Sequence, residues 1–204
     1  MKKKLILASA LSLSLALAAC NGNDDKENGG TDATEGLETN IVTIATGGAS
    51  GPYNIIGTTL ADQYVKEFDV NSRTQTTGAS VENINLLEQG KAEMAFVMSD
   101  ALSQAINGEV SFNEPIKNVS QIATLYPNVV QIITKEGSGI KTIEDLKGKR
   151  IAVGDQNSGV EINARVLLNG HGITYEDVKV DYLGYAEAAD GLKAGTIDAA
   201  FLTS

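Results

Sequence analysis

The sequence predicts an α/β fold built from two similar units of strands and helices. A phrase at residues 87–99, LEQGKAEMAFVMS, returns at residues 192–204 as LKAGTIDAAFLTS. Both copies contain a helix end, a glycine, an acidic residue, a buried strand and a hydroxyl residue. Short β-branched runs alternate with helical patterns elsewhere, which is typical of parallel sheets. Two such units side by side leave a cleft, where we expect a small-molecule site.

The first unit, residues 41–127, follows the order βαβαβα, which predicts a parallel sheet. Ser80 is the expected N-cap of the second helix, because its hydroxyl can accept the N–H of Asn83. The strands are predicted at residues 41–45, 73–77 and 94–97, and the helices at 53–68, from Ser80 to Gly90 and from Ser99 to about Asn107.

The second unit, residues 128–204, repeats the alternation after a break. Two strand-like runs flank Pro127, at residues 122–126 and 129–134, and we interpret them as the passage between the units. A variant capping box joins Thr142 to Asp145. The remaining strands are predicted at 150–154 and 178–182, and the helices from Asn157 and at 187–192, before the second copy of the repeated phrase.

Residues 1–19 have the pattern of a secretory signal peptide, with three lysines before an apolar run. That run is shorter than the ~20 residues of a membrane span. Leu17–Cys20 resembles the bacterial lipobox, which implies cleavage before Cys20, lipid attachment to Cys20 and an extracytoplasmic domain anchored to the lipid bilayer. The alternative is an ordinary signal peptide followed by a chance cysteine. Cys20 is the single cysteine of the chain, so no disulfide is expected.

Residues 20–40 are predicted to be a flexible acidic tether, because their composition offers too little apolar surface to fold. Removing residues 1–19 takes away three of the 16 Lys and Arg and none of the 26 Asp and Glu, which leaves a net charge of −13. A charge of this sign argues against nucleic acid as a partner.

Several predicted helices begin directly after a strand, where α/β sheets bind ligands. These starts offer hydroxyls, amides and backbone N–H groups but almost no Lys or Arg. They therefore suit a ligand carboxylate held by neutral donors. Three acids in first turns, Glu82, Asp100 and Glu161, have two interpretations. Each either stabilises its helix dipole or meets a ligand ammonium.

The sequence offers little support for an enzyme, a metal site or a cofactor. His171 is the single histidine and lies in a Gly-rich turn, so a His-rich metal site is excluded. The Gly47–Gly51 loop lacks the ending of a P-loop and the spacing of a dinucleotide fingerprint. Ser158 is not flanked as in a nucleophile elbow. Pairs of carboxylates for hydrolysis stay open, because the sequence does not show their spatial neighbours.

Several stretches resemble the TAXI family, the solute-binding subunits of tripartite ATP-independent periplasmic (TRAP) transporters. The resemblance covers residues 41–204. It is carried most specifically by ATGGASGPY at 45–53, TGASVEN at 77–83 and YAEAA at 185–189, and also by SGIKTIEDLKGKR at 138–150 and GVEINAR at 159–165.

The resemblance implies a type II periplasmic-binding-protein fold, with a hinge between lobes 41–127 and 128–204. It implies glutamate or a related amino or organic acid as ligand, and a membrane permease as partner. The ligand-binding residues that it implies are Thr46, Gly47, Gly48, Gly51, Tyr53, Ser80, Val81, Glu82, Asn83, Ser99, Asp100, Ser158, Gly159 and Glu161.

The chain departs from the family pattern at two points. Met98 stands where relatives often have Gln, so the ligand is expected to differ. Family members also continue beyond the position of Ser204, so the second lobe is expected to be incomplete and the chain less stable than a longer form. Three alternatives remain: a receptor for an ABC importer, a surface antigen or sensor module, and an enzyme on the same fold.

Overall fold

The computed structural model describes residues 37–204. The predicted signal peptide, Cys20 and most of the predicted tether lie outside the described residues. Residues Gly36–Ser204 form one compact unit. The last tether residues lead directly into the fold, and Leu37 packs against the core of the first sheet. Within residues 37–204, no helix has the length and apolar character needed to cross a bilayer.

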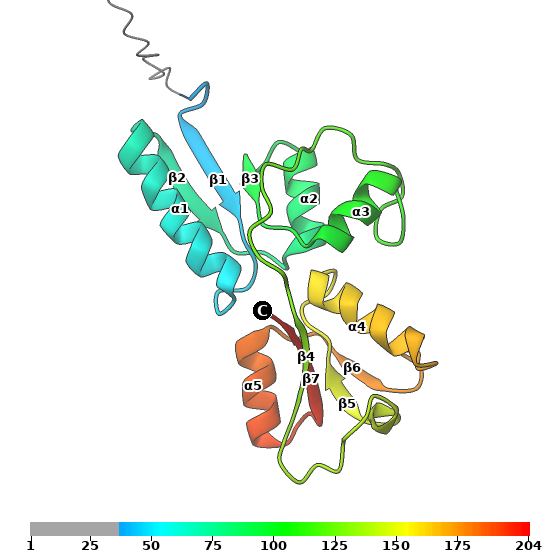
Figure 1. The fold of residues 1–204 in the computed structure, drawn as a ribbon. Coiled ribbons are helices and arrows are strands. Elements are labelled where there is room, and N and C mark those ends of the chain that lie inside the picture. Colours follow the sequence, from blue (N-terminus) through cyan, green and yellow to red (C-terminus); the bar gives the residue numbers. More distant parts are fainter. Residues whose placement is uncertain (1–36) are drawn as a thin grey trace, which may run out of the picture. The chain divides into compact units, whose positions relative to one another are not determined.

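The first sheet has three parallel strands in the order β2-β1-β3 (Figure 1). Its strands are β1 (Ile41–Ala45), β2 (Asn71–Gln75) and β3 (Met94–Ala95), and its helices are α1 (Pro52–Phe68), α2 (Ser80–Glu88) and α3 (Ser99–Asn107). The predicted alternation is therefore confirmed for this unit, with β2 beginning two residues earlier than expected.

The second sheet has the order β4-β7-β5-β6 and is mixed. It contains β4 (Val130–Thr134), β5 (Arg150–Ala152), β6 (Lys179–Asp181) and β7 (Ala199–Thr203), with the short 3₁₀ helix η1 (Glu144–Leu146) and the helices α4 (Gly159–Gly170) and α5 (Tyr185–Ala194). β5 is parallel to β6 and β7, whereas β4 is antiparallel to β7. The connection from β4 to β5 contains the short η1 and no crossover α-helix of the kind that joins parallel strands.

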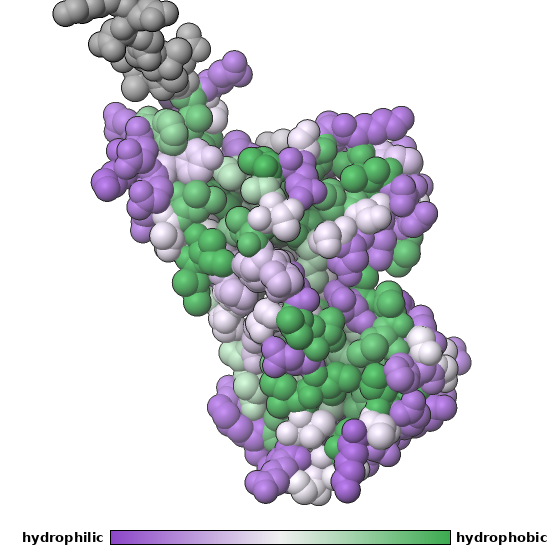
Figure 2. All heavy atoms as spheres, in the orientation of Figure 1, coloured by the Kyte–Doolittle hydropathy of each residue, from purple (hydrophilic) through white to green (hydrophobic). Residues whose placement is uncertain are grey.

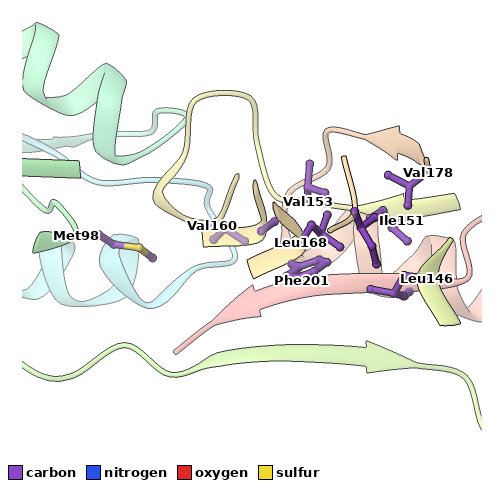
Figure 3. Close-up of a cluster of buried hydrophobic side chains, with 11 residues drawn as sticks. Met98, Leu146, Ile151, Val153, Val160, Leu168, Val178 and Phe201 are labelled. Carbon is purple, nitrogen blue, oxygen red and sulfur yellow. The ribbon is translucent and has the colours of Figure 1, made fainter. Parts of the chain in front are cut away.

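Each face of the second sheet packs against a different helix, since successive side chains of a strand point to opposite faces. Ile151 of β5 and Phe201 of β7 join the cluster under α4, together with Val160 and Leu168 (Figure 3). The neighbouring alanines Ala152 and Ala200 join the cluster under α5. Small side chains on one face therefore let α5 approach closely, while large ones fill the space beneath α4.

The two copies of the repeated phrase occupy equivalent places in the two sheets. Glu93 precedes β3 and accepts a hydrogen bond from the backbone N–H of Thr43 in β1 at 2.6 Å. Asp198 precedes β7 and accepts one from Arg150 in β5 at 2.8 Å. In each copy the acidic side chain thus accepts the backbone N–H that comes just before the first paired residue of the neighbouring parallel strand, which is Ile44 in β1 and Ile151 in β5. This shared role is a physical reason for the repeat in the sequence.

The halves of the chain interlock through α4. Met98, which precedes α3, belongs to the cluster under α4, and Figure 3 shows it at the edge of that cluster beside Val160. Conversely, Ile162 of α4 joins the cluster between α2 and α3. Asn163 also donates a hydrogen bond to the Asp100 carboxylate at 3.0 Å. Each half of the chain thus completes part of the core of the other.

Two local predictions are wrong. Ser80 is the first residue of α2 rather than its N-cap, and its hydroxyl accepts the N–H of Met98 at 3.1 Å instead. Residues 122–126 form no strand, because β7 pairs with residues 130–134 and leaves the earlier run without a partner. That run is largely exposed, with Ile122 79% and Leu125 61% accessible. Figure 2 shows hydrophobic residues interspersed with hydrophilic ones over the drawn face of the molecule.

The approach of α1 to the first sheet requires glycine at position 57. A Cβ on Gly57 would lie 2.5 Å from Thr46 Cγ2 and 3.2 Å from Phe96 Cε2. We therefore expect Gly57→Ala to lower the free energy of unfolding by about 1–3 kcal/mol, as overpacking does in other cores. Urea denaturation measures this change.

Gly170→Ala is the matched control, because nothing lies within 4 Å of a Cβ at that helical position. Alanine is favoured over glycine in helices, so this variant should match or exceed the wild-type stability by up to about 1 kcal/mol. Equal losses in both variants would contradict a close approach at Gly57.

Candidate functional site

A cleft lies at the carboxyl ends of the parallel strands and draws its walls from both halves of the chain. Its cavity volume is about 50 Å³, which suits a small ligand. Its lining residues are Gly47, Gly48, Ser50, Gly51, Pro52, Tyr53, Ala79, Met98, Asn128, Gly154, Asp155, Ser158, Gly159, Val160, Tyr185 and Thr203.

All five α-helices of residues 37–204 begin at this cleft. Gly51, Ala79, Met98 and Ser158, the N-cap residues of α1 to α4, line it, and so does Tyr185, the first residue of α5. The positive ends of the helix dipoles therefore meet at one space, although some first-turn N–H groups, such as those of Val81 and Ala101, already have partners in the fold. Such convergence favours a negatively charged group on the ligand.

The loop before α1 forms one wall. The N–H of Gly51 bonds to the carbonyl of Gly48 at 2.9 Å, and Pro52 then starts the helix. Tyr53 stacks on Phe96 with ring centroids 5.2 Å apart, and its hydroxyl accepts a hydrogen bond from Asn128 at 3.2 Å. Burial raises the pKa of Tyr53, so its hydroxyl stays neutral. The contact to Asn128 ties α1 to the segment that precedes β4.

The start of α4 forms the facing wall. The Ser158 hydroxyl accepts the N–H of Glu161 at 3.1 Å and so caps the helix that the sequence predicted to start near Asn157. Its own proton has no acceptor within the described residues and is free to be donated. Gly154 precedes this turn with a φ of +88°, a conformation that favours glycine. The turn directs Ser158 and the first N–H groups of α4 into the cleft.

Tyr185 lines the cleft, and its neighbour Tyr126 lies outside the lining. The Tyr185 hydroxyl donates to the carbonyl of Thr203 at 2.7 Å and thereby ties α5 to the end of β7. The Tyr126 hydroxyl is buried and has no hydrogen-bond partner among the described residues. Burial, reinforced by Tyr185, raises the pKa of Tyr126. The phenol of Tyr126 therefore remains a neutral hydroxyl.

Asp155 is the single charged side chain in the lining. Its backbone carbonyl accepts the N–H of Ser158 at 3.0 Å, which holds the loop before α4. Its carboxylate accepts no hydrogen bond and meets no Lys or Arg within residues 37–204. Burial, followed by repulsion from Glu187 and Glu82, raises its pKa above the usual aspartate value.

The structure brings six of the predicted ligand-binding residues into the cleft lining: Gly47, Gly48, Gly51, Tyr53, Ser158 and Gly159. The other eight lie outside the lining: Thr46, Ser80, Val81, Glu82, Asn83, Ser99, Asp100 and Glu161. Among these, Val81 is a core residue, Ser99 is exposed, and Glu82 accepts the N–H of Gly78 at 2.6 Å.

Asn83 is fully buried beneath the cleft and joins the ends of three strand segments. Its amide nitrogen donates to the carbonyls of Thr46 at 2.6 Å and Phe96 at 2.7 Å. Its oxygen accepts the Thr77 hydroxyl at 2.6 Å. The buried Thr46 hydroxyl in turn donates to the carbonyl of Gln75 at 3.0 Å. These side chains hold the strand ends that carry the cleft loops, and their polar atoms are already satisfied.

Glu161 is buried, with 3% of its surface exposed, and points away from the cleft lining. It forms an ion pair with Arg165 and accepts the Tyr175 hydroxyl at 2.9 Å. The Arg165 guanidinium also lies 4.6 Å from the centroid of the Tyr175 ring. Glu161 is thus compensated within its own helix region, as a buried carboxylate requires.

Sequence reasoning missed Asn128, Asp155 and Tyr185. Two of them could have been predicted from their positions after strands. Asp155 follows β5 at the same spacing as Gly48 follows β1, and Tyr185 starts α5 after β6. Asn128 gave no local signal, since it reaches the cleft from an irregular segment. No group of three or more potential metal ligands occurs within residues 37–204.

A model of the NMT1-like family matches residues 44–204. The chain is also similar to the alkanesulfonate-binding protein SsuA from Xanthomonas axonopodis pv. citri bound to MOPS, with 21% identity and a TM-score of 0.52 over 80% of this chain and 54% of that chain. It therefore spans about half the length of that protein.

Two further solved structures are similar. An ABC uptake transporter substrate-binding protein from Streptococcus pneumoniae with bound histidine has 16% identity and a TM-score of 0.57, over 80% of this chain and 66% of that chain. An ancestral arginine-binding protein bound to glutamine has 20% identity and a TM-score of 0.55, over 82% of this chain and 71% of that chain. These likenesses confirm the predicted α/β fold of type II periplasmic binding proteins.

The buried position of Asn83 predicts a loss of stability when its amide is removed. Asn83→Ala leaves the carbonyls of Thr46 and Phe96 without their donor, so we expect the free energy of unfolding to fall by about 2 kcal/mol or more. Chemical denaturation provides the measurement. Asn85→Ala, on the same helix, removes an amide that bonds to no described residue, and should change stability by less than about 0.5 kcal/mol. Wild-type stability in Asn83→Ala would contradict the scaffold role.

Proposed function

Because this chain belongs to the NMT1-like family, we propose that it is an extracytoplasmic receptor that captures a small carboxylate-bearing solute for a membrane permease. The observation that carries the proposal is the convergence of five helix N-termini on one cleft without a single Lys or Arg in its lining. Neutral donors and helix dipoles suit one carboxylate better than a densely charged polyphosphate.

The ligand proposed is glutamate or a related amino or organic acid. It lies between the loop at residues 46–53 and the start of α4, and its carboxylate takes up N–H groups that no described residue occupies. Two lobes, 41–127 and 128–204, separate to admit the solute and close upon it, and the contacts of Met98 and Ile162 across the halves stabilise the closed state. The connection near Pro127 serves as the hinge.

The proposed delivery partner is the permease of a TRAP-type transporter, which takes its energy from an ion gradient. The residues that resemble the TAXI family support this choice, and lipid attachment at Cys20 would keep the receptor near its permease. An ABC importer is the second candidate, because similar solved structures include the substrate-binding protein of an ABC uptake transporter. In both cases the chain binds its solute and leaves it chemically unchanged.

A pair of isosteric variants at Ser158 tests anion binding in the cleft. Both Ser158→Asp and Ser158→Asn retain an N-capping side chain, so both should fold. The introduced carboxylate takes the free N–H groups of α4 and repels an anionic ligand. We expect L-glutamate to bind Ser158→Asp at least about tenfold more weakly than Ser158→Asn, a difference of about 1.4 kcal/mol measured by titration calorimetry. Equal affinities would contradict a carboxylate at this helix start.

Uptake measurements separate the two transporter types. In cells that produce the full chain and its permease, we expect a protonophore or removal of the sodium gradient to stop solute uptake, while ATP depletion with the gradient clamped leaves it intact. The reverse pattern would establish the ABC importer. Uptake that is unchanged after deletion of the gene would contradict a transport role and favour a surface or sensor module.

A further inference from the structure

We propose that the Asp155 carboxylate binds a cationic amine of the ligand, so that the cleft selects amino acids over carboxylic acids that lack the amine. The inference deepens the proposed function and rests on it. It assigns the two charges of one small molecule to two parts of the same cleft. The helix starts receive the carboxylate, and Asp155 receives the ammonium.

Asp155 lies where loops of the two sheets approach each other. It follows β5 and lines the cleft together with Gly48, which follows β1. A Cβ on Gly48 would lie 3.7 Å from Asp155 Oδ2, and one on Gly184, the N-cap of α5, would lie 3.5 Å from the same oxygen. The absence of side chains at both glycines leaves the carboxylate open to a ligand in the cleft.

The charged groups that influence Asp155 are all acidic. Glu187 contributes from α5 and Glu82 from α2, and neither neutralises its charge. No Lys or Arg nitrogen lies within 4 Å of its carboxylate in the described part of the chain. A half-buried carboxylate without a cation or a hydrogen-bond donor is costly, because burial disfavours the ionised form. The pKa of Asp155 is raised for this reason.

Asp155 has no evident structural task that would offset this cost. The usual role of an acid near a helix start is to cap it, but Ser158 already caps α4 by accepting the N–H of Glu161 at 3.1 Å. By contrast, Asp198 and Glu93 each accept a backbone N–H and so support their strands. Asp155 therefore differs from the acids that stabilise this fold, and a ligand cation supplies the partner that it lacks.

A neutral variant separates binding from stability. Asp155→Asn keeps the size of the side chain and removes its charge. The matched control Glu187→Gln removes a charge from the same neighbourhood, but Glu187 does not line the cleft. The probes are the twenty amino acids, each paired with the carboxylic acid that lacks its α-amino group, for example L-glutamate with glutarate. Binding to the full 204-residue chain is measured by thermal shift and then by calorimetry.

We expect at least one amino acid to bind the wild-type chain at least tenfold more tightly than its partner acid. Asp155→Asn should lose that preference through a tenfold or greater loss for the amino acid, with the partner acid unchanged or tighter. Glu187→Gln should keep the preference. The wild-type preference should also fade in acid, as the pH drops through the raised pKa of Asp155, and should be absent from Asp155→Asn at every pH.

The melting temperature of the ligand-free proteins gives a second measurement. An aspartate with a purely structural role would stabilise the fold, so its replacement would lower that temperature. The unpaired charge destabilises the folded chain above the pKa of Asp155, so Asp155→Asn should melt at a higher temperature than the wild type at neutral pH. A lower melting temperature would show that Asp155 supports the fold and would overturn the proposal.

The outcomes distinguish the binding of an amine by Asp155, here called the amine site, from the proposed function. Partner acids that bind as tightly as the amino acids, or an Asp155→Asn variant that keeps the amino-acid preference, would overturn the amine site and leave a carboxylate receptor standing. A folded wild-type chain that binds no member of the panel would overturn the proposed function and the amine site together.

Discussion

The direction of the parallel strands is the constraint on which the rest of this structure depends. When strands run parallel, each crossover helix begins at the edge where a strand ends. Both sheets end their parallel strands at the cleft, so all five α-helices of residues 37–204 begin there. The electrostatic character of the cleft thus comes from backbone dipoles rather than from basic side chains. An excess of acidic residues in the whole sequence does not prevent an anion from binding at such a place.

A buried polar framework keeps those helix starts in register. The amide of Asn83 joins carbonyls from the ends of β1 and β3, and the Thr46 hydroxyl reaches the end of β2. Such groups are expensive to bury unless every partner is present, and here the partners are backbone atoms of adjacent strands. The framework lies one layer beneath the ligand space. It fixes where the loops at Gly47 and Gly78 leave the sheet without touching what they bind.

Asp155 differs from this framework, because the fold does not satisfy its polar group. The acids at Glu93, Asp198 and Glu161 are each compensated by a donor within the fold. The Asp155 carboxylate has no such donor among the described residues, and this lowers the stability of the ligand-free protein. Unsatisfied groups of this kind recur at functional sites, where a ligand supplies the missing partner. The same reasoning applies to the buried Tyr126 hydroxyl, which also lacks a partner among the described residues.

The sequence by itself determined the alternation of strands and helices and the helix start near Asn157, because these depend on neighbours within a few residues. It also revealed the repeat, whose acids Glu93 and Asp198 prove to have one structural role. Only the tertiary structure decided which polar side chains face the cleft. Asn83 and Glu161, in the first turns of α2 and α4, are buried in the fold, whereas Asp155, in the loop before α4, lines the cleft. These positions depend on how the helices pack against the sheets. That packing joins residues far apart in the chain, and no local pattern encodes it.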